Sequence, residues 1–147
     1  MDHIEFASDS GGCGSFVVFK MNYENNMGVA VMGSREQLNL SKEEQTFDLS
    51  KTSSDILHVE IVKYIKLVSA YYCDDVAGDE IEDLWTSTSG KVKIQIMQDF
   101  EDGLSIWDRI YIITVKIENI VLENSKGDKI KIDYLDFNNV RVGFLPG

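Results

Sequence analysis

The chain has 147 residues, the usual size of one domain, and its 44% hydrophobic and 27% charged residues indicate a folded protein rather than a disordered one. Its formal net charge of −11 repels a phosphate backbone, which excludes nucleic acid as an expected partner. The sequence has no apolar run long enough to span a membrane, and a chain of this length requires no cofactor to fold.

Residues 1–14 are rich in small and polar residues, among them Gly11, Gly12 and Gly14. Such a composition favours chain entropy over packing. We therefore expect a flexible leader over residues 1–14 and a single β-sandwich domain over residues 15–147.

The first half of the domain alternates β-rich stretches with turn residues. Aromatic and β-branched residues predict strands over 16–19 and 29–32, joined by a turn over 22–26, and a short strand over 45–49. In residues 57–61 the apolar side chains recur at every second position, so one face of that strand is expected to be buried and the other wet.

The second half contains the clearest strand patterns. Residues 91–96 alternate apolar and polar side chains throughout, and residues 111–122 alternate until the phase changes near Glu118 and Asn119. One inserted residue restores the alternation, so a β-bulge is predicted there. A turn over 125–128 and strands over 130–134 and 140–144 complete the chain.

These patterns predict an all-β fold. About eight short strands without long intervening helices indicate an antiparallel β-sandwich, jelly-roll-like or immunoglobulin-like, with an open barrel as the alternative. Only residues 34–44 and 77–84 lack β character, and each could hold two or three helical turns at most.

The two cysteines, Cys13 and Cys73, are too few for a structural zinc site unless both histidines converge with them. In an oxidising compartment an even number of cysteines suits a disulfide, whereas in the cytosol both thiols would stay reduced. We expect a Cys13–Cys73 disulfide and an extracytoplasmic location, with a cytoplasmic location as the alternative.

The candidate catalytic pair is His58 with Glu60, which point to the same side of one predicted strand as a base and its orienting group would. An exposed strand histidine beside an exposed carboxylate is the simpler interpretation. The sequence contains no nucleophile motif such as G-x-S-x-G. No catalytic residue is therefore assigned.

The densest polar cluster places six carboxylates within residues 74–83. Gly78 allows this segment to curl, and oxygen ligands suit calcium, although the spacing is not that of an EF-hand. A solvated acidic loop is the competing interpretation. The predicted calcium ligands are Asp74, Asp75, Asp79 and Asp83.

Two tryptophans, Trp85 and Trp107, lie near strand ends beside acidic segments. Aromatic faces of this kind stack on sugar rings, while nearby carboxylates accept hydrogen bonds from sugar hydroxyls. The competing interpretation is that both rings plug the ends of the core.

Together these features predict a non-catalytic extracytoplasmic binding or interaction module with a protein or carbohydrate ligand. A structural subunit that pairs through an exposed strand edge is the alternative, and an enzyme is the third.

Overall fold

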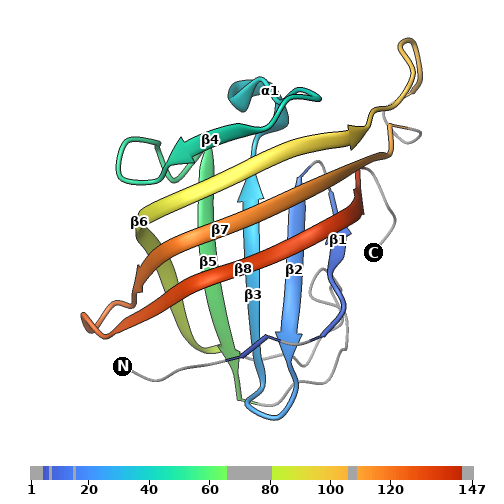
Figure 1. Ribbon diagram of the computed structural model, residues 1–147. Helices are drawn as coiled ribbons and strands as arrows, with labels where there is room; N and C mark the ends of the chain where they lie inside the picture. Colours follow the sequence, from blue (N-terminus) through green and yellow to red (C-terminus); the bar gives the residue numbers. More distant parts are fainter. Residues whose placement is uncertain (1–4, 7, 15, 66–80, 106–108, 144–147) are drawn as a thin grey trace.

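The computed structural model describes residues 5–6, 8–14, 16–65, 81–105 and 109–143. In chain order the elements are β1 (Gly11–Cys13), β2 (Val17–Asn22), β3 (Met27–Gly33), α1 (Arg35–Leu38), β4 (Gln45–Asp48), β5 (Leu57–Tyr64), β6 (Ile81–Gln98), β7 (Tyr111–Glu123) and β8 (Lys129–Val142). The predicted all-β class is confirmed (Figure 1).

The described strands form one eight-stranded sheet with antiparallel pairing throughout. Seven strands follow the order β1-β2-β3-β5-β6-β7-β8, and β4 pairs with β6 off this path. The sheet curls, so that β1, β2, β3 and β5 run across the direction of β6, β7 and β8 (Figure 1).

The curl depends on β6, which serves both halves of the sheet. Its first part pairs with β5 and its last part pairs with β4, while β7 runs alongside from Thr86 onward. Gly90 lies between these parts with a φ of 121°, a conformation that favours glycine. A Cβ at this position would lie 2.7 Å from the Asn119 carbonyl oxygen, so the two strands approach closely where β6 bends.

The predicted bulge in β7 is confirmed. Lys91 pairs with Glu118 and Ser89 pairs with Val121, so β7 has one more residue than β6 across this interval. Asn119 takes the left-handed conformation with a φ of 52°. The extra residue explains why the buried positions of β7 change phase after Ile117.

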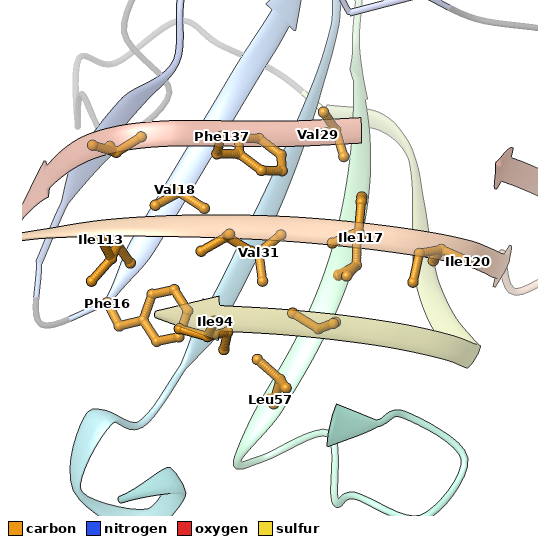
Figure 2. Packing of buried hydrophobic residues seen from close by; sticks show 14 of the residues in the cluster. Phe16, Val18, Val29, Val31, Leu57, Ile94, Ile113, Ile117, Ile120 and Phe137 are labelled. Carbon is orange, nitrogen blue, oxygen red and sulfur yellow. The ribbon is translucent and has the colours of Figure 1, made fainter. Parts of the chain in front are cut away.

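The main core lies inside the curl and is almost entirely aliphatic. Figure 2 shows side chains from β2, β3 and β5 packed against side chains from β6, β7 and β8, with Phe16 and Phe137 among them. The alternating residues predicted for the strands at 57–61, 91–96 and 111–122 are the ones buried here. Fourteen-residue β8 also contributes Ile130, Ile132, Val140 and Val142.

A second, smaller cluster lies on the opposite face of β2, β3 and β5. Its buried members are Phe19, Met21, Ala30, Val62 and Tyr64. Both faces of this part of the sheet are therefore apolar, which explains why β2 and β3 appear in the sequence as nearly continuous apolar runs.

Part of the predicted leader is packed structure. Gly11, Gly12 and Cys13 form β1 and pair with β2, and Phe6 belongs to the main core. β1 also lies against β8, where the Gly143 amide donates to the Gly14 carbonyl oxygen over 2.6 Å. We call this contact the β1–β8 seam. The glycines permit this close approach, because a Cβ on Gly12 would lie 2.5 Å from the Arg141 carbonyl oxygen.

Two other expectations are corrected. The strands predicted at 130–134 and 140–144 are joined in β8, which passes through a bulge at Asn139. The helix within 34–44 is α1, which is capped by Ser34, ends at left-handed Asn39 and stays within the two or three turns expected at most. Residues 81–84, grouped with a helical segment, begin β6 because they pair with β5.

Replacing Gly90 by alanine is expected to destabilise the fold by about 2–4 kcal/mol, because the new Cβ would meet both backbone and the Ile120 side chain. Gly103→Ala is the matched control, since Gly103 also has a positive φ but has open space around it, and should cost about 1 kcal/mol. Urea unfolding measures both. Equal losses would show that contact between β6 and β7 at the bend does not constrain the fold.

Candidate functional site

His58 and Glu60 are brought together as the sequence predicts. His58 Nε2 lies 3.0 Å from Glu60 Oε1, and Nδ1 lies 3.0 Å from the Ser54 carbonyl oxygen. The hydrogen bond with Glu60 raises the pKa of His58 against the opposing effect of burial. Both ring nitrogens face acceptors, so the protonated ring links β5 to the turn that precedes it.

Of the predicted calcium ligands, Asp74, Asp75 and Asp79 lie outside the described residues. Asp83 lies on β6, where its carboxylate accepts hydrogen bonds from the Leu84 amide and from the side chain of buried Asn124. No group of three potential metal-ligating residues occurs in the part of the chain that the structure describes. Calcium binding by the segment 74–83 stays a prediction.

Trp85 is partly buried and packs against the main core, with its indole nitrogen shielded from solvent. A ring in this position does not present an open platform for stacking on a sugar. Trp107 lies outside the described residues, so the glycan platform stays a prediction for that residue.

Cys13 is buried on β1 in register with Val17. Gly12, its neighbour, pairs with core residue Val18, so alternation places Cys13 on the face that carries the second cluster. Cys73 lies outside the described residues, and the disulfide stays a prediction.

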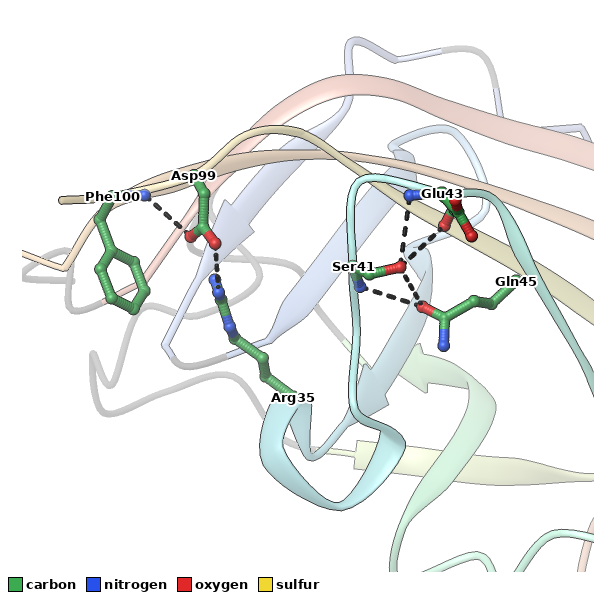
Figure 3. A network of polar contacts seen from close by, with 6 residues as sticks. All are labelled: Arg35, Ser41, Glu43, Gln45, Asp99 and Phe100. Carbon is green, nitrogen blue, oxygen red and sulfur yellow. Dashed lines mark hydrogen bonds and ion pairs between the residues drawn. The ribbon is translucent and has the colours of Figure 1, made fainter. Parts of the chain in front are cut away.

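A cluster centred on Arg35 joins α1 to the end of β6 (Figure 3). The guanidinium donates to Asp99 Oδ2 over 2.7 Å and lies 4.5 Å from the Phe100 ring centre and 4.3 Å from that of Tyr111. Burial opposes ionisation of Asp99, but the hydrogen bonds from Arg35 and from the Phe100 amide, together with the attraction of the Arg35 and Lys42 charges, outweigh it and lower the pKa of Asp99. Burial raises the pKa of Tyr111 to about 12. Arg35 is thus held by its neighbours in a structural contact.

A shallow groove lies at the other end of the sheet from α1, where residues near the N-terminus cross the end of β2. Two hydrogen bonds hold them there: the Met21 amide donates to Ser8 Oγ over 2.7 Å, and Asn22 Nδ2 donates to the Glu5 carbonyl oxygen over 2.7 Å. The groove has a volume of about 420 Å³ and is lined by Glu5, Ser8, Met21, Asn22, Tyr23 and Glu24.

Exposed apolar side chains gather at this same end. The β2–β3 turn, the end of β5 and the start of β6 lie together there (Figure 1), with the Tyr64 amide donating to the Asn26 carbonyl oxygen and Tyr64 paired with Ile81. Of the six large hydrophobic side chains exposed in the described part of the chain, four are here: Tyr23, Ile65, Ile81 and Leu84. We call these four residues and the groove the hairpin-end surface.

Sequence analysis missed this surface because its parts are far apart in the chain. Residues 22–26 had the composition of an ordinary turn, and Glu5 and Ser8 fell within the predicted leader. The available signal was Tyr23, a large aromatic residue in a segment otherwise made of asparagine and glutamate.

Comparison with protein-family models, with curated proteins and with solved structures finds no match of any of the three kinds. No helix among the described residues is long and apolar enough to cross a membrane. The functional argument therefore depends on the geometry of this chain alone.

The His58–Glu60 contact predicts a pH dependence of stability. A folded-state pKa raised above the ordinary 6.5 adds stability below that pH, and this stability is lost as the pH rises through the folded-state pKa. Glu60→Gln should therefore cost more at about pH 5.5 than at about pH 8.5, by less than about 1 kcal/mol for a partly exposed pair. Urea unfolding at both pH values measures the difference.

Glu82→Gln is the control, because it breaks the exposed Lys63–Glu82 pair, whose Nζ–Oε2 distance is 3.3 Å, without involving a histidine. Its cost should be the same at both pH values. A pH-independent cost for Glu60→Gln would contradict the assigned role of His58.

The predicted Cys13–Cys73 disulfide should stabilise the protein by about 2–4 kcal/mol. Thiol counting on unreduced, denatured protein is expected to find no free thiol. Two free thiols would exclude the disulfide and remove the main support for an extracytoplasmic location.

Proposed function

We propose that this protein is a non-catalytic extracytoplasmic binding module that holds its ligand on the hairpin-end surface. The observation that supports this function is the coincidence of the groove with four of the six exposed large hydrophobic side chains in the described part of the chain. Isolated exposed apolar residues are ordinary, whereas a group of them beside a groove is typical of an interaction site.

The chemistry of the surface supports binding rather than catalysis. The groove is lined mainly by polar side chains, of which the Ser8 hydroxyl and the Asn22 amide already bond within the chain and shape the groove, while the Glu24 carboxylate is exposed to solvent. The described histidine, His58, contacts Glu60 and the Ser54 carbonyl oxygen and does not line the groove. His58 is therefore not placed to transfer a proton to or from a ligand held in the groove.

The same proposal includes an open barrel rather than a two-sheet sandwich. The unbroken order of paired strands through β6, together with the contact between its two end strands β1 and β8, supports the barrel. Charged residues along β8, including Lys129, Lys131 and Asp133, disfavour the alternative of assembly through that strand edge.

The binding surface can be tested by nuclear magnetic resonance with a panel of neutral oligosaccharides and short basic, neutral and acidic peptides. At least one probe should shift amide resonances of the β2–β3 turn and of β6 near Leu84. Tyr23→Ala combined with Leu84→Ser should weaken that probe at least tenfold, because both exposed contacts are lost.

Tyr134→Ala combined with Met97→Ser is the matched control, since these two residues are also exposed large hydrophobics but lie outside the hairpin-end surface. The control should bind as the unmodified protein does. Binding that shifts resonances elsewhere, or no binding by any probe, would contradict the proposed function.

A further inference from the structure

The sequence contains a modification motif that the proposed function does not use. Asn39, Leu40 and Ser41 form the pattern N-x-S, in which the middle residue is not proline. In an exported protein this pattern is an acceptor for an N-linked oligosaccharide. No other asparagine in this sequence has serine or threonine two positions later. Because three residues can match a motif by chance, the place of Asn39 in the fold decides whether it can carry a glycan.

Asn39 lies where a large substituent can be accommodated. It follows α1, is exposed, and takes the left-handed conformation with a φ of 52° and a ψ of 52°. Its backbone is fixed on both sides, because its amide donates to the Glu36 carbonyl oxygen over 3.1 Å and its carbonyl oxygen accepts from Gln45 Nε2 over 3.1 Å. Its side-chain amide makes no hydrogen bond in the described part of the chain. A sugar on this side chain therefore displaces no contact of the fold.

The other two residues of the motif keep Asn39 at the surface. Leu40 is 9% exposed and belongs to the main core, whereas its neighbours on both sides are exposed. The Ser41 hydroxyl accepts from the Glu43 amide over 3.3 Å and donates to the Glu43 carbonyl oxygen over 3.4 Å (Figure 3). The loop is thus anchored at Leu40, and Asn39 and Ser41 face outward.

We propose that Asn39 is an N-glycosylation site. The proposal rests on the extracytoplasmic location included in the proposed function and goes beyond the ligand of the hairpin-end surface. Because the folded loop engages the Ser41 hydroxyl, which is part of the recognised motif, the glycan is added before this loop folds.

The co-reactant is an oligosaccharide carried on a lipid diphosphate. The side-chain nitrogen of Asn39 forms a bond to C1 of the first sugar, and the bond between C1 and the diphosphate oxygen breaks. The diphosphate leaves with that electron pair, and the amide nitrogen gives one proton to a base of the transferase. Asn39 remains an amide, and the step needs no oxidant or reductant.

A glycan at this position would lie away from the hairpin-end surface. Both α1 and β4 lie at the opposite end of the sheet from the β2–β3 turn (Figure 1). The hydrogen bond from Gln45 places Asn39 beside the first residue of β4, which pairs with β6 alone among the described strands. A bulky, hydrated glycan there shields the edge of β4 from pairing with another chain and leaves the hairpin-end surface open.

The test is a mass measurement on the intact protein isolated from its native source, before and after an amidase that removes N-linked glycans. The amidase should remove the mass of one glycan and leave aspartate at position 39, as peptide mapping will show. Fractionation of the same cells places the protein inside or outside the cytoplasm.

Variants produced in the same source separate the motif from incidental modification. Asn39→Gln and Ser41→Ala should each abolish the loss of mass, whereas Ser41→Thr should retain it because threonine preserves the motif. Ser41→Ala keeps Asn39 and its left-handed conformation, so it provides the test if Asn39→Gln does not fold. Asn138→Gln is the matched control, since Asn138 is exposed but lacks the hydroxyl two residues later, and it should retain the glycan.

An exported protein with no amidase-sensitive mass at position 39 would overturn the proposal and leave the proposed binding function intact. A glycan retained by Ser41→Ala would also overturn it, because the motif would not direct the modification. A protein confined to the cytoplasm would contradict both the glycan and the proposed location. Weaker binding of a hairpin-end ligand by the glycan-free protein would contradict the placement of the glycan away from that surface.

Discussion

The bend of β6 at Gly90 is the constraint on which the rest of the fold depends. One strand pairs with β5 before the bend and with β4 after it, so it joins the two strand directions in a single sheet. The Asn119 bulge in β7 accommodates the bend and keeps the apolar side chains of β7 facing inward on both sides of it. Without these two adjustments the core residues of β7 could not all face β2, β3 and β5.

Asparagine provides the backbone conformations that this curled sheet needs. Among the described residues, every non-glycine residue with positive φ is an asparagine: Asn26 in the β2–β3 turn, Asn39 at the end of α1, Asn119 in β7 and Asn139 in β8. Asparagine tolerates the left-handed conformation better than most residues because its short side chain bonds locally. Asn22 illustrates this bonding, since its Oδ1 accepts from the Asn25 amide in the turn beside the groove.

Local periodicity was sufficient to predict much of the fold but not the candidate site. Alternation identified the buried face of β5, β6 and β7, and a break in alternation located the bulge near Asn119, because burial forces a side-chain period of two. Two features could not be obtained in this way. The first is strand β1, whose glycine-rich residues 11–13 pair with β2 while the Phe19 ring covers Gly11. The second is the hairpin-end surface, whose residues come together only when β2, β5 and β6 are aligned in the folded sheet.

The tertiary structure gives Trp85 and Asp99 surroundings that their neighbours in the sequence do not indicate. Trp85 was a candidate for sugar stacking, but its position on β6 opposite Ile61 turns it toward the core. Asp99 belonged to an acidic segment, but Arg35 neutralises it at the end of β6. In both cases a residue that is distant in sequence decides the outcome, 64 positions away for Asp99 and Arg35, and no local pattern reports that neighbour.

The β1–β8 seam has a consequence for how the molecule forms. It joins segments near the two ends of the chain, whereas β2–β3 and β7–β8 are hairpins between neighbours in sequence. Closing so long a loop costs more chain entropy than forming a hairpin, and that cost must be met before the contact is gained. The hairpins are therefore expected to fold early and the seam to close last. In the native state the Gly143 amide, which bonds to the Gly14 carbonyl oxygen at this seam, is expected to exchange its hydrogen before the amides in the middle of the sheet.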